Sequence, residues 1–174
     1  GSHHGTPRNG ATFVGGRVGQ CFSLDGIDDY IDDLGTASTF AFIENTGVFT
    51  IETWIGLDVP NAPRTQIFCG NVSSTTEKGW YFAYVNNLGQ HQLNMIPVRG
   101  NGAVIDSRSP EGLITDGFWH HVAATGNGTS VTFYVDGVAY PGSGTMGTKS
   151  SGDATRAVAI GWDGIGSYYG GQLD

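Results

Sequence analysis

The sequence predicts an all-β domain built as a two-sheet antiparallel sandwich. Glycine makes up 29 of the 174 residues, whereas only 14% are charged and 39% are hydrophobic. Apolar stretches punctuated by glycine suit a domain of many short strands and tight turns. Short alternating runs bounded by glycine, asparagine and aspartate recur along the chain, and no helix-period segment exceeds one turn. Together these patterns indicate strands and turns, and the chain length suits one domain.

The expected strands follow one another along the whole chain. In Val131–Val135 the valines and Phe133 share one face, and in Thr50–Ile55 the residues Ile51, Thr53 and Ile55 lie opposite Glu52 and Trp54, which is the period of a half-buried strand. The dipeptide Asp136-Gly137 then supplies hairpin-turn chemistry before Val138–Tyr140. In order, we expect strands near residues 12–14, 20–24, 29–33, 48–57, 65–70, 79–85, 91–96, 103–108, 118–125, 130–136, 156–161 and 168–173.

Three sequence blocks carry a family resemblance. They read GQCFSLDGIDDYI at 19–31, FTIETWI at 49–55 and WHHVAA at 119–124, and FYVDG follows at 133–137. Their order and spacing resemble the laminin-G-like jelly-roll domains of the concanavalin-A-like lectin/glucanase superfamily. The resemblance runs from about Gly10 to Asp174 and implies a jelly-roll sandwich that is secreted or displayed on a surface. It does not imply a ligand, because lectins, adhesion modules and structural domains share this fold.

The resemblance also bears on the domain boundaries. Residues 1–6 resemble the remnant of an expression tag, so His3 and His4 are not counted as ligands, and residues 7–174 form the single laminin-G-like domain. Family members usually continue their last strand past the position that Asp174 occupies. We therefore expect a fragment of a larger protein.

Charge and hydropathy exclude several kinds of partner. The net charge is −8 with only eight scattered lysines and arginines, which disfavours nucleic acid because phosphate binding needs a basic surface. No apolar run approaches the length of a membrane span, so membrane insertion is not expected. The amino-acid sequence of residues 11–30 resembles bacterial sequences. We therefore expect an extracellular or cell-surface location in a bacterium.

The two cysteines, Cys21 and Cys69, lie in different expected strands. One disulfide and two buried free thiols both remain open.

An acidic turn is the candidate metal site. Asp25 and Asp28 lie within five residues in the turn DGIDD, and calcium prefers several carboxylate and carbonyl oxygens. The resemblance makes Asp174 the best single calcium ligand, because many relatives hold a calcium near the strand that ends there. The alternative is that Asp25 and Asp28 cap a turn through their own side chains.

Two further patterns favour structure over catalysis. Glu52 and Trp54 share one face, as do Trp119 and His121; this is an acid–base pair or, as we prefer, a satisfied polar pair in the sandwich. Glycoside hydrolysis needs two carboxylates flanking the scissile bond, and no glutamate lies in a strand with alternating acidic residues. We therefore expect no enzyme activity.

Two glycine-rich loops combine aromatic, amide, carboxylate and guanidinium groups. Aromatic faces stack on the apolar side of a pyranose while polar groups meet its hydroxyls. Trp80 and Tyr81 follow a third loop and could join them. The candidate ligand-binding residues are Trp162, Asp163, Tyr168 and Tyr169 in one loop and Arg99, Asn101, Asp106 and Arg108 in the other.

The sequence therefore favours a non-catalytic, lectin-like carbohydrate-binding module with calcium as a structural ion and a glycan or cell-surface polysaccharide as partner. The alternative is a structural or protein-binding adhesion domain without sugar affinity. Exposure of Trp162, Tyr168 and Tyr169 separates the two hypotheses.

Overall fold

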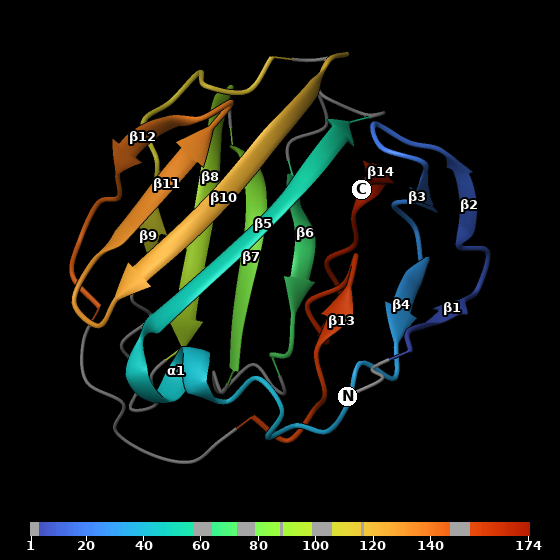
Figure 1. Ribbon diagram of the computed structural model, residues 1–174, viewed down its shortest axis with the longest axis horizontal. Helices are drawn as coiled ribbons and strands as arrows, with labels where there is room; N and C mark the ends of the chain where they lie inside the picture. Colours follow the sequence, from blue (N-terminus) through green and yellow to red (C-terminus); the bar gives the residue numbers. More distant parts are fainter. Residues whose placement is uncertain are drawn as a thin grey trace.

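The protein is a sandwich of two antiparallel sheets with seven strands each, as the sequence predicts (Figure 1). The computed structural model describes residues 4–57, 64–72, 79–87, 89–98, 106–115, 117–146 and 154–174. Arg99, Asn101 and the first half of the strand expected at 103–108 lie outside these residues.

Sheet A has the strand order β1-β4-β13-β6-β7-β8-β9. A bulge between Ile67 and Cys69 interrupts the pairing of β6 with β7. The strands are β1 (Thr6–Arg8), β4 (Tyr30–Asp32), β13 (Ala159–Ile160), β6 (Arg64–Gly70), β7 (Gly79–Asn87), β8 (Gln90–Val98) and β9 (Ser107–Arg108).

Sheet B has the order β12-β11-β10-β5-β14-β3-β2, so β14, the last strand in the sequence, lies between β5 and β3. The one helix among the described residues, α1 (Phe42–Thr46), precedes β5 and ends at Gly47, whose φ is 67°. The strands are β12 (Val138–Pro141), β11 (Val131–Val135), β10 (Trp119–Asn127), β5 (Val48–Leu57), β14 (Gly170–Leu173), β3 (Gln20–Asp25) and β2 (Thr12–Gly15).

The core fills the space between the sheets. On β11, Val131, Phe133 and Val135 are buried while the residues between them are half-exposed, which confirms the alternation read from the sequence. Phe82 of sheet A stacks on Phe133 of sheet B, with ring centroids 6.4 Å apart. Burial of such large apolar side chains contributes about 1.5–3 kcal/mol each.

The turn at Asp136-Gly137 confirms the predicted hairpin. Both residues have positive φ, 50° and 83°, as a two-residue type I′ turn requires. The turn brings Val138 of β12 opposite Val135 of β11.

Some elements differ from the sequence prediction. Thr6, which we expected to precede the domain, begins β1 and pairs with Asp32. The strand expected at 156–161 is only the two-residue β13, which ends before Gly161, whose φ of 82° an extended strand does not allow. Among the described residues, no helix is long and apolar enough to cross a membrane.

Candidate functional site

The loop between β13 and β14 carries the predicted aromatic residues. Trp162 and Tyr168 form an isolated antiparallel bridge. Between them, Oδ1 of Asp163 accepts hydrogen bonds from the backbone N–H groups of Ile165, Gly166 and Ser167 at 2.9, 3.0 and 3.1 Å. A carboxylate that accepts several local N–H groups fixes a turn, so the loop presents its two aromatic rings from a braced backbone.

Trp162 lies at the centre of an aromatic and cationic cluster. Its ring stacks on Tyr168 with a centroid distance of 5.9 Å and packs against Tyr30 at 4.8 Å. The guanidinium of Arg156 lies over the same indole, 5.0 Å from the centroid, a cation–π geometry. The indole N–H is buried and has no acceptor among the described residues, which is uncommon for a buried donor.

A pocket of about 190 Å³ opens beside this cluster. Trp162 and Arg156 line it together with Asp32 and Asp33 at the end of β4. Arg8 holds both carboxylates, with N–O distances of 2.7 Å to Asp32 and 2.8 Å to Asp33. The pocket therefore combines an indole, a guanidinium and two fixed carboxylates.

Two of the four predicted ligands in this loop are not available to a ligand. Tyr169 is fully buried, and its hydroxyl donates to the carbonyl groups of Gly56 and Gln172. Asp163 is 3% exposed, and its carboxylate accepts hydrogen bonds from the loop backbone. Their assignment as ligand-binding residues is wrong, because one completes the core and the other braces the turn.

The second predicted group forms a polar cluster at the β8–β9 edge of sheet A. Asp106 forms an ion pair with Arg108 at 2.6 Å, and its other oxygen accepts a hydrogen bond from Asn94. The hydrogen bond with Asp106 raises the pKa of Arg108. Because Asp106 is engaged on both oxygens, it orients the Arg108 guanidinium more than it offers a site of its own.

Tyr81 links the polar cluster to the aromatic loop. It pairs with Gly70, which lines the Trp162 pocket. Desolvation raises the pKa of Tyr81, and the charges of Asp106 and Asp163 raise it further. Trp80, its neighbour, points into the core instead and is 2% exposed.

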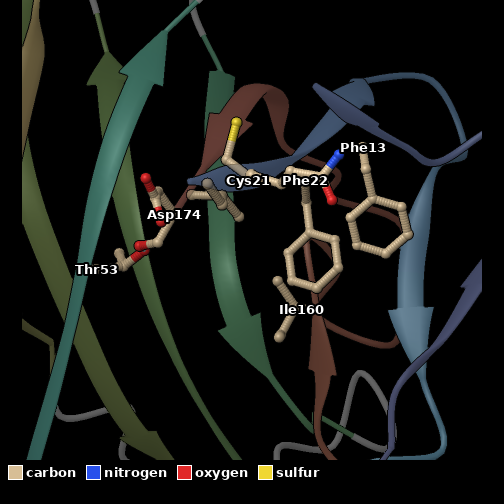
Figure 2. A pocket seen from close by; sticks show the side chains of 8 residues that line it. Phe13, Cys21, Phe22, Thr53, Ile160 and Asp174 are labelled. Atoms are coloured by element: carbon tan, nitrogen blue, oxygen red, sulfur yellow. The ribbon is translucent and has the colours of Figure 1, made fainter. Parts of the chain in front are cut away.

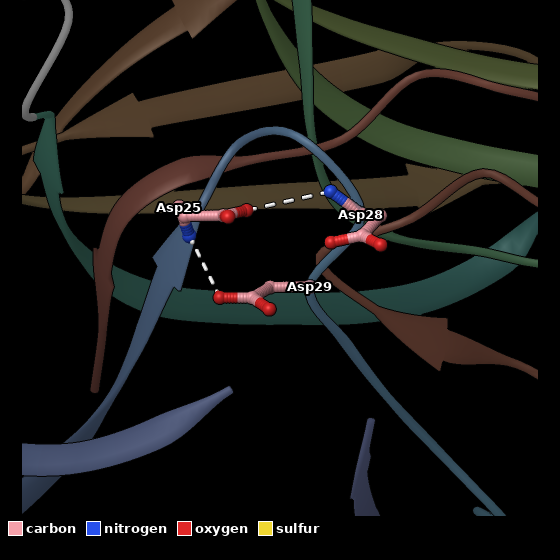
Figure 3. Close-up of side chains that lie close together, drawn as sticks. All are labelled: Asp25, Asp28 and Asp29. Atoms are coloured by element: carbon pink, nitrogen blue, oxygen red, sulfur yellow. Dashed lines mark hydrogen bonds between the residues drawn. The ribbon is translucent and has the colours of Figure 1, made fainter. Parts of the chain in front are cut away.

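The acidic turn after β3 brings three carboxylates together (Figure 3). One oxygen each from Asp25, Asp28 and Asp29 lies within 4.8 Å of the others. Asp25 Oδ1 accepts from the N–H groups of Ile27 and Asp28, and Asp29 Oδ2 accepts from the N–H of Asp25. This is the turn chemistry that the sequence offered as the alternative to calcium.

Asp174 does not belong to this turn. Strand β14 pairs antiparallel with β3, so Gly170 lies opposite Asp25 and Leu173 opposite Phe22. Asp174 thus lies toward the other end of β3, where its side chain accepts from the N–H of Val18 at 2.6 Å. The expected grouping of Asp174 with Asp25 and Asp28 is wrong because the antiparallel register separates them.

The oxygen set of the turn fits a hard cation in one respect. Asp29 is 4% exposed, and its Oδ1 has no partner among the described residues. A buried carboxylate oxygen without a donor is costly, and a bound cation would satisfy it. Asp29 belongs to the predicted acidic turn but was not among the predicted ligands, and it is the residue that decides this site.

The set Glu52, Trp54, Trp119 and His121 lies on the outer face of sheet B, where neighbouring strands bring Glu52 and His121 together as expected. His121 and Trp54 are cross-strand neighbours with rings 5.3 Å apart, and His121 lies 3.7 Å from Glu52. The guanidinium of Arg17 covers Trp54 at 5.1 Å. Side chains alternate between the two faces along β5, so Glu52 and Trp54 lie on the face that points away from the core.

Cys21 and Cys69 are free thiols in the structure. They lie in different sheets, β3 of sheet B and β6 of sheet A. Desolvation raises the pKa of Cys69 to about 12.

Residues 25–174 match the family model of the concanavalin A-like lectin/glucanases superfamily of laminin G type. The chain belongs to this superfamily. No curated protein sequence matches it.

Solved structures show the same fold at low sequence identity. Domain 4 of an extracellular GH43 arabinanase from Geobacillus stearothermophilus, in complex with arabinotriose, gives a TM-score of 0.66 at 18% identity over 95% of this chain and 73% of that chain. The CBM40 of the Ruminococcus gnavus IT-sialidase, bound to α2,3-sialyllactose, gives 0.64 at 14% identity over 88% of this chain and 85% of that one.

Proposed function

We propose that this chain is a non-catalytic carbohydrate-binding module of a larger secreted or cell-surface bacterial protein. The observation that carries the proposal is the pocket beside Trp162, where an indole, the Arg156 guanidinium and the carboxylates of Asp32 and Asp33 converge. The sugar-bound modules among the structural neighbours support it.

The chemistry of the pocket suits a sugar. Carboxylates accept hydrogen bonds from hydroxyl groups and a guanidinium donates them, while aromatic rings cover apolar C–H faces. Arg156 is exposed and lies on the indole, so an incoming sugar ring would displace it and take its place on Trp162. The displaced guanidinium would then be free to meet a hydroxyl or carboxylate of the ligand.

The polar cluster of Asn94, Asp106 and Arg108 extends this surface. Tyr81 joins it to the Trp162 pocket through its pairing with Gly70. A ligand longer than one sugar would contact Trp162 at one end and Arg108 at the other. Arg99 and Asn101, which lie outside the described residues, remain candidate contacts in this proposal.

A glycan-array screen of the purified domain, followed by calorimetry on any hit, tests the proposal. Trp162→Ala should abolish binding. Trp54→Ala is the matched control, because that indole also lies beneath an arginine but on the outer face of sheet B. Equal loss in both variants, with both folded by circular dichroism, would contradict the assigned site.

The competing function is a structural or protein-binding adhesion domain without sugar affinity. Its support is the burial of Asp163 and Tyr169, which removes half of the predicted sugar contacts in the aromatic loop. A blank array with a well-folded domain would favour this alternative.

A further inference from the structure

Two neighbouring carboxylates share one counter-ion at the end of β4. Arg8 donates from Nε to Oδ1 of Asp32 at 2.7 Å and from Nη2 to Oδ2 of Asp33 at 2.8 Å. Successive residues of a strand point to opposite faces, but Asp33 follows the last residue of β4 and has a φ of 62°. With this turn of the backbone, both carboxylates reach the same guanidinium, and both line the pocket beside Trp162.

The group of Arg8, Asp32 and Asp33 carries an excess negative charge. Two carboxylates against one guanidinium leave one negative charge uncompensated, in a chain whose net charge is −8. Each carboxylate bonds Arg8 through one oxygen, and its other oxygen has no hydrogen-bond donor among the described residues. The two side chains are 30% and 57% exposed, so these other oxygens are accessible to a ligand.

The pocket also holds a positive charge that can leave it. The Arg156 guanidinium lies over the Trp162 indole, 5.0 Å from the ring centroid, where the face of the ring attracts a cation. Arg156 is exposed and forms no ion pair within the part of the chain that the structure describes. A sugar ring that displaces Arg156 from the indole therefore removes a positive charge from the pocket.

We propose that this pocket selects sugars that carry a free amino group, and that they bind with this group as an ammonium ion. The inference rests on the proposed sugar-binding function of the same pocket and names the class of sugar. The sugar ring takes the place of Arg156 on Trp162, and its ammonium group donates hydrogen bonds to the accessible oxygens of Asp32 and Asp33. An ammonium group has three donors and no acceptor, which matches two carboxylate oxygens that lack donors.

Neutral and acidic sugars fit the charges of the pocket less well. A neutral sugar that displaces Arg156 leaves the excess negative charge uncompensated. A sugar acid would pair with Arg156, but its carboxylate would share a pocket of about 190 Å³ with Asp32 and Asp33, and like charges at such short range repel. An ammonium group restores the positive charge that Arg156 takes away.

A second pocket, of about 250 Å³, has a different lining (Figure 2). The rings of Phe13 and Phe22 face it, and Asp174 is the only charged residue among the described ones that line it. A single carboxylate beside phenylalanine rings offers no second acceptor of the same charge for an ammonium group. We therefore assign the amino sugar to the pocket beside Trp162.

The experiment titrates the 174-residue protein with matched pairs of methyl glycosides. Each pair consists of glucosamine or galactosamine and its N-acetylated form, which has the same ring without the charge. At about pH 6, amines are protonated and exposed carboxylates are ionised. The indole N–H signal of Trp162 in a two-dimensional NMR spectrum, assigned with Trp162→Ala, reports binding. The amine of at least one pair should bind roughly five-fold more tightly than its N-acetylated form, and added salt should reduce this preference.

Two variants that each remove one negative charge locate the effect. Asp33→Asn should abolish most of the preference for the amine, because asparagine tolerates the left-handed φ as aspartate does but carries no charge. Glu52→Gln, on the outer face of sheet B and 68% exposed, should leave the preference unchanged. Arg156→Gln should tighten binding of the amino sugar, because the competing cation is gone. Folding of all three variants is checked by circular dichroism.

Each outcome bears on a different part of the proposal. Binding at Trp162 without a preference for the amine in either pair would overturn this inference and leave the proposed function standing, whereas failure of every carbohydrate to bind would overturn both. Equal loss of the preference in Asp33→Asn and Glu52→Gln would trace it to the overall charge of the protein and overturn the assignment to the pocket. Weaker binding of the amino sugar to Arg156→Gln would overturn the exchange of the two cations.

Discussion

Replacing Asp163 with alanine should loosen the loop that carries Trp162 and Tyr168. One carboxylate oxygen accepts three backbone N–H groups there, and the side chain is almost fully buried. The substitution removes all three acceptor contacts at once. Asp163→Asn keeps an oxygen at the same position but removes its charge.

The size of the effect follows from the solvent access of the three donors. A hydrogen bond to a charged group contributes about 1.5–3 kcal/mol. Ile165 and Gly166 are exposed and Ser167 is half-buried, so water replaces much of what is lost. We expect Asp163→Ala to lower the free energy of unfolding by about 2–3 kcal/mol and Asp163→Asn by about half as much.

Urea denaturation monitored by tryptophan fluorescence measures both variants. For a chain of this length, about 1 kcal/mol shifts Tm by about 2–4 °C, so Tm should fall visibly in Asp163→Ala. If the alanine variant unfolded within about 0.5 kcal/mol of the parent, the carboxylate would not be the brace of this loop.

Three further predictions concern titration and metal binding. Desolvation alone would raise the pKa of Asp136, but hydrogen bonds from His120 and from a backbone N–H outweigh it and lower the pKa. A lowered folded-state pKa stabilises the protein above the unfolded-state pKa, and this stability is lost as the pH falls through the folded value; Asp136→Asn should therefore flatten the acid limb of a Tm-against-pH curve. If the turn after β3 binds calcium, added calcium should raise the Tm of the parent protein and leave the Tm of Asp29→Asn unchanged. An unchanged Tm in the parent would mean that hydrogen bonds alone hold the turn. Tyr81→Phe should remove one late-ionising tyrosine from an ultraviolet pH titration, since desolvation raises its pKa; an unaltered high-pH limb would contradict that burial.

The fold was predictable because its signals are local. Alternation in Val131–Val135 and the turn residues Asp136-Gly137 are short-range features that tertiary contacts reinforce. The helix α1 and the strand β1 were missed, since they are too short for a periodic pattern. Such elements form because their neighbours hold them, as Asp32 holds Arg8.

The candidate site was only half predictable. Trp162 and Tyr168 were found because aromatic residues in a glycine-rich loop are visible in sequence. Their partner Tyr30 comes from β4 and carries no local signal, and the pairing of β13 with β4 brings it to Trp162. Arg156 precedes β13, and the sequence does not show that its guanidinium lies over the indole. Tyr169, one residue from Tyr168, was misassigned because a strand turns successive side chains to opposite faces.

The order of strands within the two sheets also has a kinetic consequence. Strands β1 to β4 connect to the remaining strands through β13 in sheet A and β14 in sheet B. The hairpins of β7 with β8 and of β10 with β11 and β12 join neighbours along the chain and form quickly. During synthesis, β1 to β4 (residues 6–32) cannot pair into the sheets until β13 and β14 (residues 159–173) have left the ribosome. The half-formed sandwich exposes apolar surface throughout that interval, and its yield in the cell should depend on chaperone supply more than its final stability suggests.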